Sequence, residues 1–285
     1  MEEYKIWLSH LKISNKEKLQ LLNNFKDLKL LWDSSKIDLE KMNIPKNVII
    51  EILNMENRKN IEIEKNYMNK HAIKIISCIE SAYPTNLKNI SNKPALLYVQ
   101  GNVNIMQNNC IAVIGSREPS DYGKRVAKSI SKDLSDLGIT VVSGLAKGID
   151  SCSHIGALDG KSKKTIAVLG NGLKLENLYP KENLKLYEKI LENDGVIVSE
   201  YCLNEKAEKY HFPERNRIIS GISEKVLVVE AALNSGTFIT VDFALEQGKD
   251  VYAIPGGIYA KQSFGCNKLI KEGAGVVLNT KDLLE

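Results

Sequence analysis

Residues 110–117 read CIAVIGSR, a short apolar run that ends in glycine, serine and arginine. Similar apolar runs recur along the rest of the chain, each followed by small or polar residues and then by a segment with helical spacing. Apolar runs without alternation are typical of parallel strands that are buried on both faces. Strands that alternate with helices predict an open, doubly wound α/β sheet that is mostly parallel. The expected strands are 110–114, 140–142, 165–169, 196–198, 226–229 and 251–254, and the expected helices are 120–137, 150–159, 181–193, 215–222 and 236–248.

The first 66 residues differ from this pattern. They contain no glycine and one proline, Pro45, and their apolar residues recur at helical spacing. We expect a small all-helical domain at 1–66, a connector with short strands that begins the α/β domain at 67–109, and an extended α/β domain at 110–285. Matched lysines and acids favour a solvated surface for the helical domain. A module that binds the DNA backbone is the alternative, although such a hairpin usually needs a glycine turn.

The composition is that of an ordinary folded protein. Of the 285 residues, 43% are hydrophobic and 26% are charged, a balance that excludes a disordered chain. No run of 18 apolar residues is present and the chain begins with charged residues, so we expect neither a transmembrane helix nor a secretory signal. Five scattered cysteines without CxxC and four histidines without HExxH predict no disulfide framework and no metal site. We expect a cytoplasmic protein without metal or cofactor.

Small residues follow almost every expected strand. In doubly wound sheets, ligands bind at the carboxyl ends of the strands, where glycines allow close approach and the N–H groups of helix starts attract anions. Only five of the 39 basic residues are arginines, and Arg117 lies in the first of these loops. The loops predict an anionic ligand, with tight turns as the alternative explanation of the glycines. The loop residues of interest are Gly115, Ser116, Arg117, Ser143, Gly144, Lys147, Gly148, Asn171, Gly172, Ser235, Gly236 and Thr237.

The loops lack the signatures of common nucleotide-binding enzymes. A dinucleotide fold needs GxGxxG after the first strand and an acid after the second, and the chain has GSR and Ser143 at these places. The nearest match to a P-loop, 156–162, is one residue short and follows a helix. No GxSxG motif is present. A dehydrogenase, an NTPase and a serine hydrolase are therefore disfavoured.

Residues 211–221 read HFPERNRIISG and combine two arginines with an aromatic residue. Arginines bind backbone phosphates and an aromatic ring stacks on a base. The two arginines lie two positions apart and do not share a helix face. The alternative is a buried network in which one arginine pairs with Glu200 or Glu230. The candidate contacts are Phe212, Arg215, Asn216 and Arg217.

Two further pairs of polar residues each have two interpretations. Asp150 and His154 are spaced for a catalytic pair, but we favour a helix cap at Asp150 and an internally hydrogen-bonded His154. Glu200 and Glu230 both follow strands and suit a metal site, but we favour salt bridges to the arginines. No catalytic residue is predicted.

Several motifs occur in an order that identifies a family. They are GSR at 115–117, SGLAKGID at 143–150, Tyr179-Pro180 with Asn183, SEY at 199–201, FPERNRIISG at 212–221, SGT at 235–237 and GCNKLI at 265–270. Over about residues 70–285 the chain closely resembles the DNA-processing protein A family (DprA, also called Smf).

This resemblance implies an extended Rossmann-like domain without a dinucleotide. It implies a homodimer that binds and protects single-stranded DNA and loads the RecA recombinase in natural transformation and DNA recombination. Arg117, Lys147 and Lys174 would contact phosphates, and the candidate contacts of 211–221 would shape the adjoining pocket. Segment 264–274 is the candidate self-association surface in the C-terminal part of the domain. Many members add a C-terminal winged helix, and we expect no double-strand binding through such a module here.

Two alternative functions share the glycine loops. Phosphoribohydrolases that cleave nucleoside monophosphates resemble the chain at Pro255-Gly256-Gly257, but they continue with GTxxE where this chain has IYAK. Release of free base from a nucleotide would favour that enzyme. A sensor of small nucleotides would instead bind mononucleotides tightly, with little dependence on strand length.

Overall fold

The computed structural model describes residues 1–284, and its centre is a sheet in the strand order β1-β2-β6-β5-β4-β3-β7-β8-β9. Neighbouring strands from β6 to β9 are parallel, whereas β1 pairs with β2, and β2 with β6, in the antiparallel sense. All residues of β3 and β5 are buried, as continuous apolar runs require. The strands are β1 (Ile73–Ser77), β2 (Leu96–Gly101), β3 (Cys110–Ile114), β4 (Thr140–Ser143), β5 (Thr165–Leu169), β6 (Val196–Ser199), β7 (Lys225–Val228), β8 (Asp250–Ala253) and β9 (Gly275–Val276).

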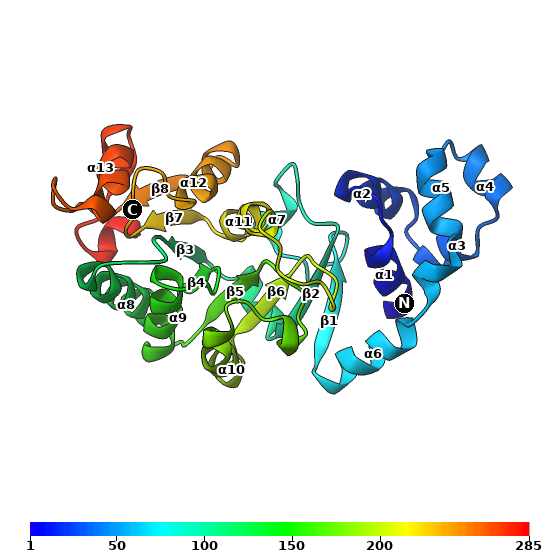
Figure 1. Cartoon of the computed structure of the whole chain (residues 1–285), viewed down its shortest axis with the longest axis horizontal. Helices are drawn as coiled ribbons and strands as arrows, with labels where there is room; N and C mark the ends of the chain where they lie inside the picture. Colours follow the sequence, from blue (N-terminus) through cyan, green and yellow to red (C-terminus); the bar gives the residue numbers. More distant parts are fainter. Residues whose placement is uncertain (285) are drawn as a thin grey trace.

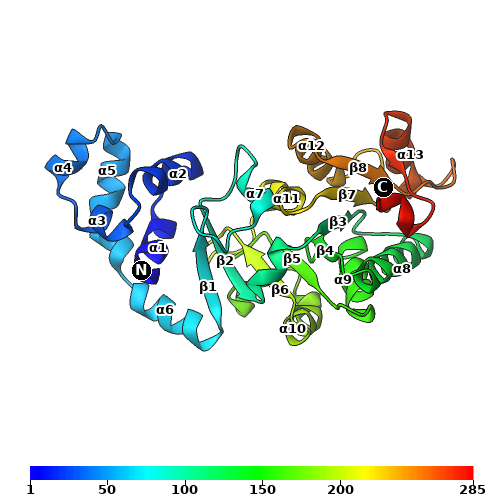
Figure 2. The same ribbon diagram turned by 180° about the vertical axis from the view of Figure 1, so that it is seen from behind.

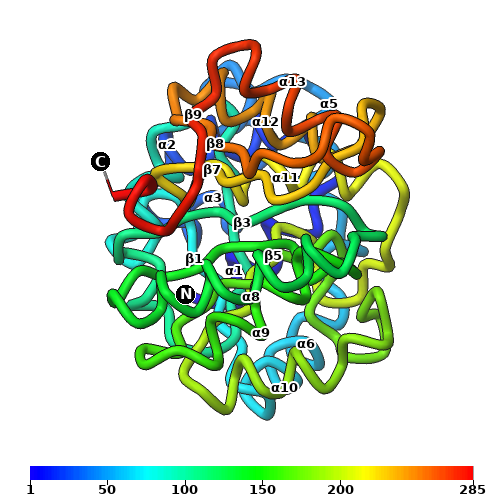
Figure 3. The backbone as a smooth tube through the Cα atoms, turned by 90° about the vertical axis from the view of Figure 1, so that its left-hand side faces the viewer, coloured from blue at the N-terminus to red at the C-terminus, as the bar shows by residue number. Residues whose placement is uncertain are grey.

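Helices cover both faces of this sheet (Figure 3). The chain runs outward from β3 through β4 and β5 to β6, and right-handed crossovers place all helices of that run on one face. It then returns to the other side of β3, so the following helices cover the opposite face. The first face carries α8 (Asp121–Asp136), α9 (Ile149–Asp159) and α10 (Leu184–Glu192); the second carries α7 (Thr85–Lys88), α11 (His211–Ile222), α12 (Thr237–Glu246) and α13 (Phe264–Lys271) (Figure 1).

The N-terminal residues form a helical lobe at the β1 end of the sheet (Figure 2). Ser14 with Glu17, and Ser35 with Asp38, form capping boxes that begin two of its helices. The Lys5 ammonium donates to the carbonyl of Ile75 at 2.8 Å, and one hydrophobic core runs from the lobe into the sheet. The lobe is therefore docked on the sheet. Its helices are α1 (Glu2–His10), α2 (Asn15–Asn24), α3 (Leu28–Asp33), α4 (Lys36–Lys41), α5 (Lys46–Leu53) and α6 (Ile61–Lys70).

The predicted fold class is confirmed, with small differences at the ends of helices. Helix α11 begins at His211, four residues earlier than expected, because Pro213 lies in its first turn and a proline there breaks no hydrogen bond of the helix. The expected helix at 181–193 is a short 3₁₀ turn, Lys181–Asn183, followed by α10. Within residues 1–284, no helix is long and apolar enough to cross a membrane.

The strand order reverses between β3 and β7. The chain leaves β3 toward α8 on one face and leaves β7 toward α12 on the other, so the two loops diverge at the carboxyl ends. Such a switch point opens a crevice in doubly wound sheets.

Candidate functional site

A groove of about 690 Å³ lies at this switch point. Its walls come from the loop after β3, the loop before α9, the first turns of α11 and the start of α12. We call it the switch-point groove. The groove is lined by, among others, Gly115, Ser116, Arg117, Ala146, Asp150, Tyr179, Lys209, Phe212, Arg215, Asn216, Ser235, Gly236 and Thr237.

The loops after β3 and β4 pack against each other through their backbones. The amide of Ile149 donates to the carbonyl of Ser116 at 3.0 Å, and the amide of Ser116 donates to the carbonyl of Glu230 at 2.7 Å. Gly148 has φ +81°, and a Cβ there would lie less than 3.0 Å from the Ser116 carbonyl. A side chain at this position is excluded by both its conformation and its space. The glycine thus allows the loops after β3 and β4 to pack closely beside the groove.

An exposed cation and two aromatic rings meet at one side of the groove. The Arg117 guanidinium carbon lies 5.4 Å from the centroid of the Phe212 ring. The Tyr179 ring centroid is 5.5 Å from that of Phe212, with the planes tilted by 55°. Arg117 is exposed and its guanidinium faces solvent as well as the ring. Such a set suits a phosphate next to a stacked base.

Arg215 forms the buried wall of the groove. Its Nη1 donates to the carbonyl of Gly144 at 2.8 Å and to that of Val168, and its Nε donates to Asn216 Oδ1 at 3.2 Å. Burial lowers the pKa of Arg215 to about 10, so it keeps its charge at neutral pH. Burial raises the pKa of the neighbouring Asp150 carboxyl, an effect that the Arg215 charge opposes. Arg215 therefore holds the strand ends together while its side chain lines the groove.

The expected cap at Asp150 is wrong. The N-cap of α9 is Gly148, and the Asp150 carboxylate accepts hydrogen bonds from the amides of Gly144 at 3.1 Å and Ala146 at 3.4 Å. It fixes the loop that precedes the helix. His154 is buried, with Nδ1 2.7 Å from Thr165 Oγ1, and burial lowers its pKa to about 3. His154 is therefore neutral and hydrogen-bonded through Nδ1 as expected, although its buried Nε2 has no partner among the described residues.

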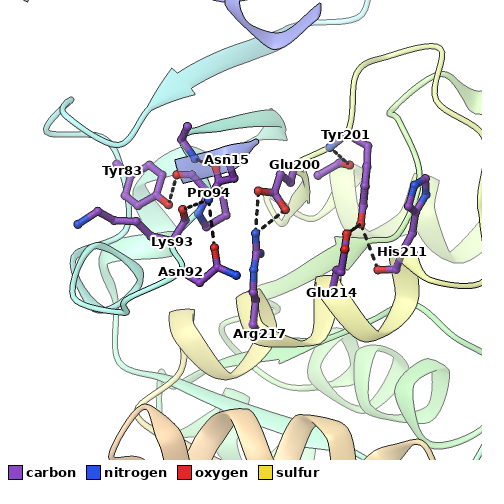
Figure 4. Close-up of polar contacts among 12 residues, drawn as sticks. Asn15, Tyr83, Asn92, Lys93, Pro94, Glu200, Tyr201, His211, Glu214 and Arg217 are labelled. Carbon is purple, nitrogen blue, oxygen red and sulfur yellow. Dashed lines mark hydrogen bonds and ion pairs between the residues drawn. The ribbon is translucent and has the colours of Figure 1, made fainter. Parts of the chain in front are cut away.

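Arg217 does not line the groove, and its side chain extends from α11 toward Glu200 (Figure 4). Its Nη2 is 2.7 Å from both oxygens of Glu200, which confirms internal pairing of one arginine. The expected arginine partner of Glu230 is wrong. The Glu230 carboxylate is buried beside the start of α8. It accepts hydrogen bonds from the amide of Ser120 at 2.8 Å and from the hydroxyl of Ser120 at 2.5 Å.

Several other predicted contacts lie in the same layer of loops but do not line the groove. The side chains of Ser143 and Asn171 are fully buried, and Gly144 and Gly172 are buried as well. Lys174 points toward the helical lobe, with its ammonium 5.2 Å from the Tyr67 ring centroid. Lys147 is exposed at the rim, where its ammonium is 2.7 Å from Glu182 Oε1. Lys147 and Lys174 are the two predicted phosphate contacts that do not line the groove. Lys147 is the nearer of the two, because it directly follows the lining residue Ala146.

Two residues that line the groove could not be predicted as site residues from the sequence. Lys209 is an exposed cation two residues before α11, in a Lys/Glu-rich stretch without a distinguishing pattern. Tyr179 belongs to a motif, but nothing in the sequence places it against Phe212. Spatial proximity across separate strand crossovers carries no local signal.

A larger cavity, of about 900 Å³, lies between the helical lobe and the end of β6. Its buried charged side chains already have partners. Arg217 pairs with Glu200, and Glu64 accepts hydrogen bonds from Tyr98 and His10 at 2.9 Å each. Because these buried charges are matched internally, this cavity is a weaker candidate than the groove. Among the described residues, no cluster of three or more His, Cys, Asp or Glu is placed to hold a metal ion.

Comparisons with known proteins agree with this geometry. A family model described as DNA recombination-mediator protein A matches residues 74–285. The DNA processing protein DprA of Streptococcus pneumoniae is 44% identical over 210 residues, which cover 73% of this chain and 72% of that protein. Protein Smf of Escherichia coli is 41% identical over 228 residues, 80% of this chain and 60% of that protein.

Solved structures extend the likeness to the whole chain. The X-ray structure of the Streptococcus pneumoniae protein superposes with a TM-score of 0.81 at 35% identity, covering 100% of this chain and 97% of that one. A structure of DNA processing protein A from Helicobacter pylori, described by its single-stranded DNA binding mode, gives a TM-score of 0.66 at 26% identity. It covers 74% of this chain and 94% of that one.

Proposed function

The chain belongs to the DNA recombination-mediator protein A family, and from that premise we propose that it binds single-stranded DNA in the switch-point groove and delivers it to the RecA recombinase. The observation that most strongly supports this proposal is the exposed Arg117 beside the Phe212–Tyr179 pair. Phosphates bind to Arg117, Lys209 and the rim lysine Lys147, while a base stacks on Phe212. The Helicobacter pylori relative, described by its single-stranded DNA binding mode, supports this ligand.

The predicted residues divide into contacts and supports. Gly115, Ser116 and Asn216 line the groove with the start of α12, where the Ser235 hydroxyl accepts from the Thr237 amide at 3.2 Å. Arg215, Ser143 and Gly144 hold this surface from below. The proposal includes no chemical step: strand binding needs only electrostatics, stacking and hydrogen bonds.

Delivery to RecA rests on the family's description as a recombination mediator. A protein with this role acts on strands that enter the cell in natural transformation, and so in the cytoplasm. Delivery to RecA is tested by adding the protein to single strands coated with single-strand-binding protein and following RecA ATPase activity. A shortened lag supports delivery, and an unchanged lag contradicts it.

We also propose that α13 and its surroundings join two copies of the chain. Apolar side chains are exposed around this helix: Ile258 is 73%, Tyr259 91% and Leu278 78% exposed. The loop of Ile258 is tied to α13 by hydrogen bonds between Gly256 and Asn267. Light scattering on Tyr259→Glu should show a shift from dimer to monomer, while Leu245→Glu on α12 should leave the mass unchanged. A monomeric wild type contradicts the dimer.

Strand binding is measured by fluorescence anisotropy with a labelled strand of about 30 nucleotides and the matching duplex as competitor, at several salt concentrations. Arg117→Ala should weaken binding about tenfold and reduce the log–log salt slope by about 0.7, the value for one phosphate on a single strand. Arg125→Ala is the matched control, because Arg125 is an exposed arginine on α8 outside the groove. Equal affinities of the two variants, or equal binding of a mononucleotide and the strand, would overturn the proposal.

A further inference from the structure

Residues 179–183 connect the groove to its rim lysine. Tyr179 contacts Phe212 at one end of this segment, and Glu182 pairs with Lys147 at the other. The segment lies in the connection between β5 and α10, whereas Lys147 lies between β4 and α9. Two separate crossovers therefore meet at the edge of the switch-point groove.

Asn183 fixes the position of the Lys147 loop. Its Nδ2 donates to the carbonyl of Leu145 at 2.8 Å, to that of Ala146 at 3.3 Å and to Ser151 Oγ at 2.9 Å. Leu145 has φ +51°, a left-handed conformation that an L-residue seldom adopts without support. The amide group of Asn183 thus satisfies the Leu145 carbonyl and shares the Ala146 carbonyl with the Ser151 hydroxyl.

The loop held by Asn183 places Lys147 next to a residue that lines the groove. Ala146 lines the groove, and a Cβ at Gly148 would meet the backbone of Ser116 and Arg117. Lys147 lies between these two positions, so its backbone is fixed beside that of Arg117. Its side chain is exposed and its ammonium bonds to Glu182, also exposed.

The Lys147–Glu182 pair is of the kind that another anion readily replaces. Exposed ion pairs are weak because water screens them. The hydrogen bond between the two groups raises the pKa of Lys147 and lowers that of Glu182, so both are charged at neutral pH. A strand phosphate that approaches Arg117 competes with the carboxylate for the ammonium.

We propose that residues 179–183 act as a clamp on the strand site: Asn183 positions Lys147 for a phosphate contact, and Glu182 occupies Lys147 until a phosphate replaces it. This inference rests on the proposed function and adds to it a positioning residue and an internal competitor. Lys147 is a strand contact, and Glu182 lowers the affinity of the site for single strands.

The first test is a double-mutant cycle on the full chain, read by anisotropy with a labelled thymidine strand of about 30 nucleotides. Glu182→Gln should tighten binding about threefold, the size of a lost exposed pair. The salt slope should stay close to that of the wild type, because Lys147 neutralises the same phosphate in both proteins and the counterion is released from the DNA. Glu188→Gln on α10 makes the same charge change at an exposed residue without an ion pair among the described residues.

The gain from Glu182→Gln should disappear when Lys147→Met is also present. A gain equal to that of Glu188→Gln, or one that persists without Lys147, would overturn the clamp. Arg117→Ala in the same assay separates the two proposals: if it weakens binding while the cycle shows no coupling, only the clamp fails. If no variant prefers single strands, the strand site itself fails.

The second test addresses Asn183. Asn183→Ala should weaken strand binding by the same factor as Lys147→Met, and the two changes together should cost no more than either one. Asn183→Ala that lowers thermal stability but keeps wild-type strand affinity would show a structural role alone and contradict the positioning role. If Asn183→Ala does not fold, the double-mutant cycle of Glu182 and Lys147 still tests whether Glu182 competes with the strand for Lys147.

Discussion

Two sets of glycine loops at the carboxyl ends of the strands look alike in sequence but differ in use. The loops after β3 and β4 border the open switch-point groove, and Gly115 lines it directly. The loop after β5 is closed, because Gly172 is buried against the backbone of Cys202 and Leu203. In the first set, small residues leave room for a ligand. In the second, they leave room for the protein itself.

The difference lies in how the loops pack after the strands. Beyond β3 and β7 the chain diverges to opposite faces, and the groove between the two loops is open. The loops after β5 and β6 also lead to opposite faces, toward α10 and α11, but they pack together, with the Ser199 hydroxyl donating to the carbonyl of Asn171 at 2.7 Å. A glycine after a strand therefore indicates close approach, and the segment that packs on the loop decides whether protein or open space lies next to it.

The largest expected effect is at Arg215, which joins the two sets of loops. Arg215→Met removes the donor to the carbonyls of Gly144 and Val168 and leaves Asp150 buried without its cation. We expect a loss of about 3–5 kcal/mol in the free energy of unfolding, measured by urea denaturation. Arg125→Met should change it by less than about 0.5 kcal/mol. If Arg215→Met kept wild-type stability but lost strand binding, Arg215 would be a ligand contact, and the contrast between open and closed loops would fail.

Gly172→Ala should be the next largest change. The new Cβ would lie less than 3.0 Å from two backbone carbonyl oxygens, which cannot move as a side-chain tip can. We expect a loss of about 3 kcal/mol in stability, the upper end of the overpacking range. Gly236→Ala is the matched control in the open region, where nothing lies within 4 Å of the added atom. Equal melting temperatures for the two variants would remove the distinction between closed and open loops.

Phe212→Ala tests the open side by function. Loss of one stacking platform should weaken strand binding by about 1–3 kcal/mol, fivefold or more. Tyr201→Ala is the control from the closed side, where the Tyr201 ring stacks on His211 at 3.9 Å between centroids. Anisotropy should show weakened binding for Phe212→Ala alone. A similar loss in Tyr201→Ala would extend the strand path past the closed loops.

The last prediction concerns the pH dependence of stability. The pKa of His154 is about 3 in the folded protein and about 6.5 when unfolded, so between these values only the unfolded state binds the proton. Stability is therefore lost as the pH falls from 6.5 toward 3, by about 1.4 kcal/mol per unit. Urea denaturation at pH 7 and pH 5 should show a steeper loss for wild type than for His154→Gln. Parallel slopes would mean that His154 is protonated in the fold.

Much of the architecture could be predicted from the sequence, and the reasons are local. Runs such as 110–114 are apolar at every position, which only a doubly covered strand tolerates. The opposite facing of Arg215 and Arg217 followed from helix geometry alone. The pairing of Arg217 with Glu200 was an open alternative because both residues had other candidate partners.

The rest of the site depends on contacts that no local pattern records. Asn171 was a reasonable ligand contact after a strand, yet its side chain is fully buried. Glu230 was assigned to an arginine, whereas it bonds to Ser120, 110 positions away. Tyr179 reaches Phe212 only because two crossovers end at the same edge. Each outcome was decided by which strands are neighbours.

The strand order also has a consequence for the newly made chain. Strand β2 takes its second neighbour from β6, so Leu97, Tyr98 and Val99 are synthesised long before residues 196–199 can pair with that edge. While the intervening segments leave the ribosome, β1 and β2 carry an apolar open edge that other chains can join. The helical lobe is made first and packs on this pair of strands. Because the lobe lies at the β1 end, the β2 edge itself stays open until β6 pairs with it.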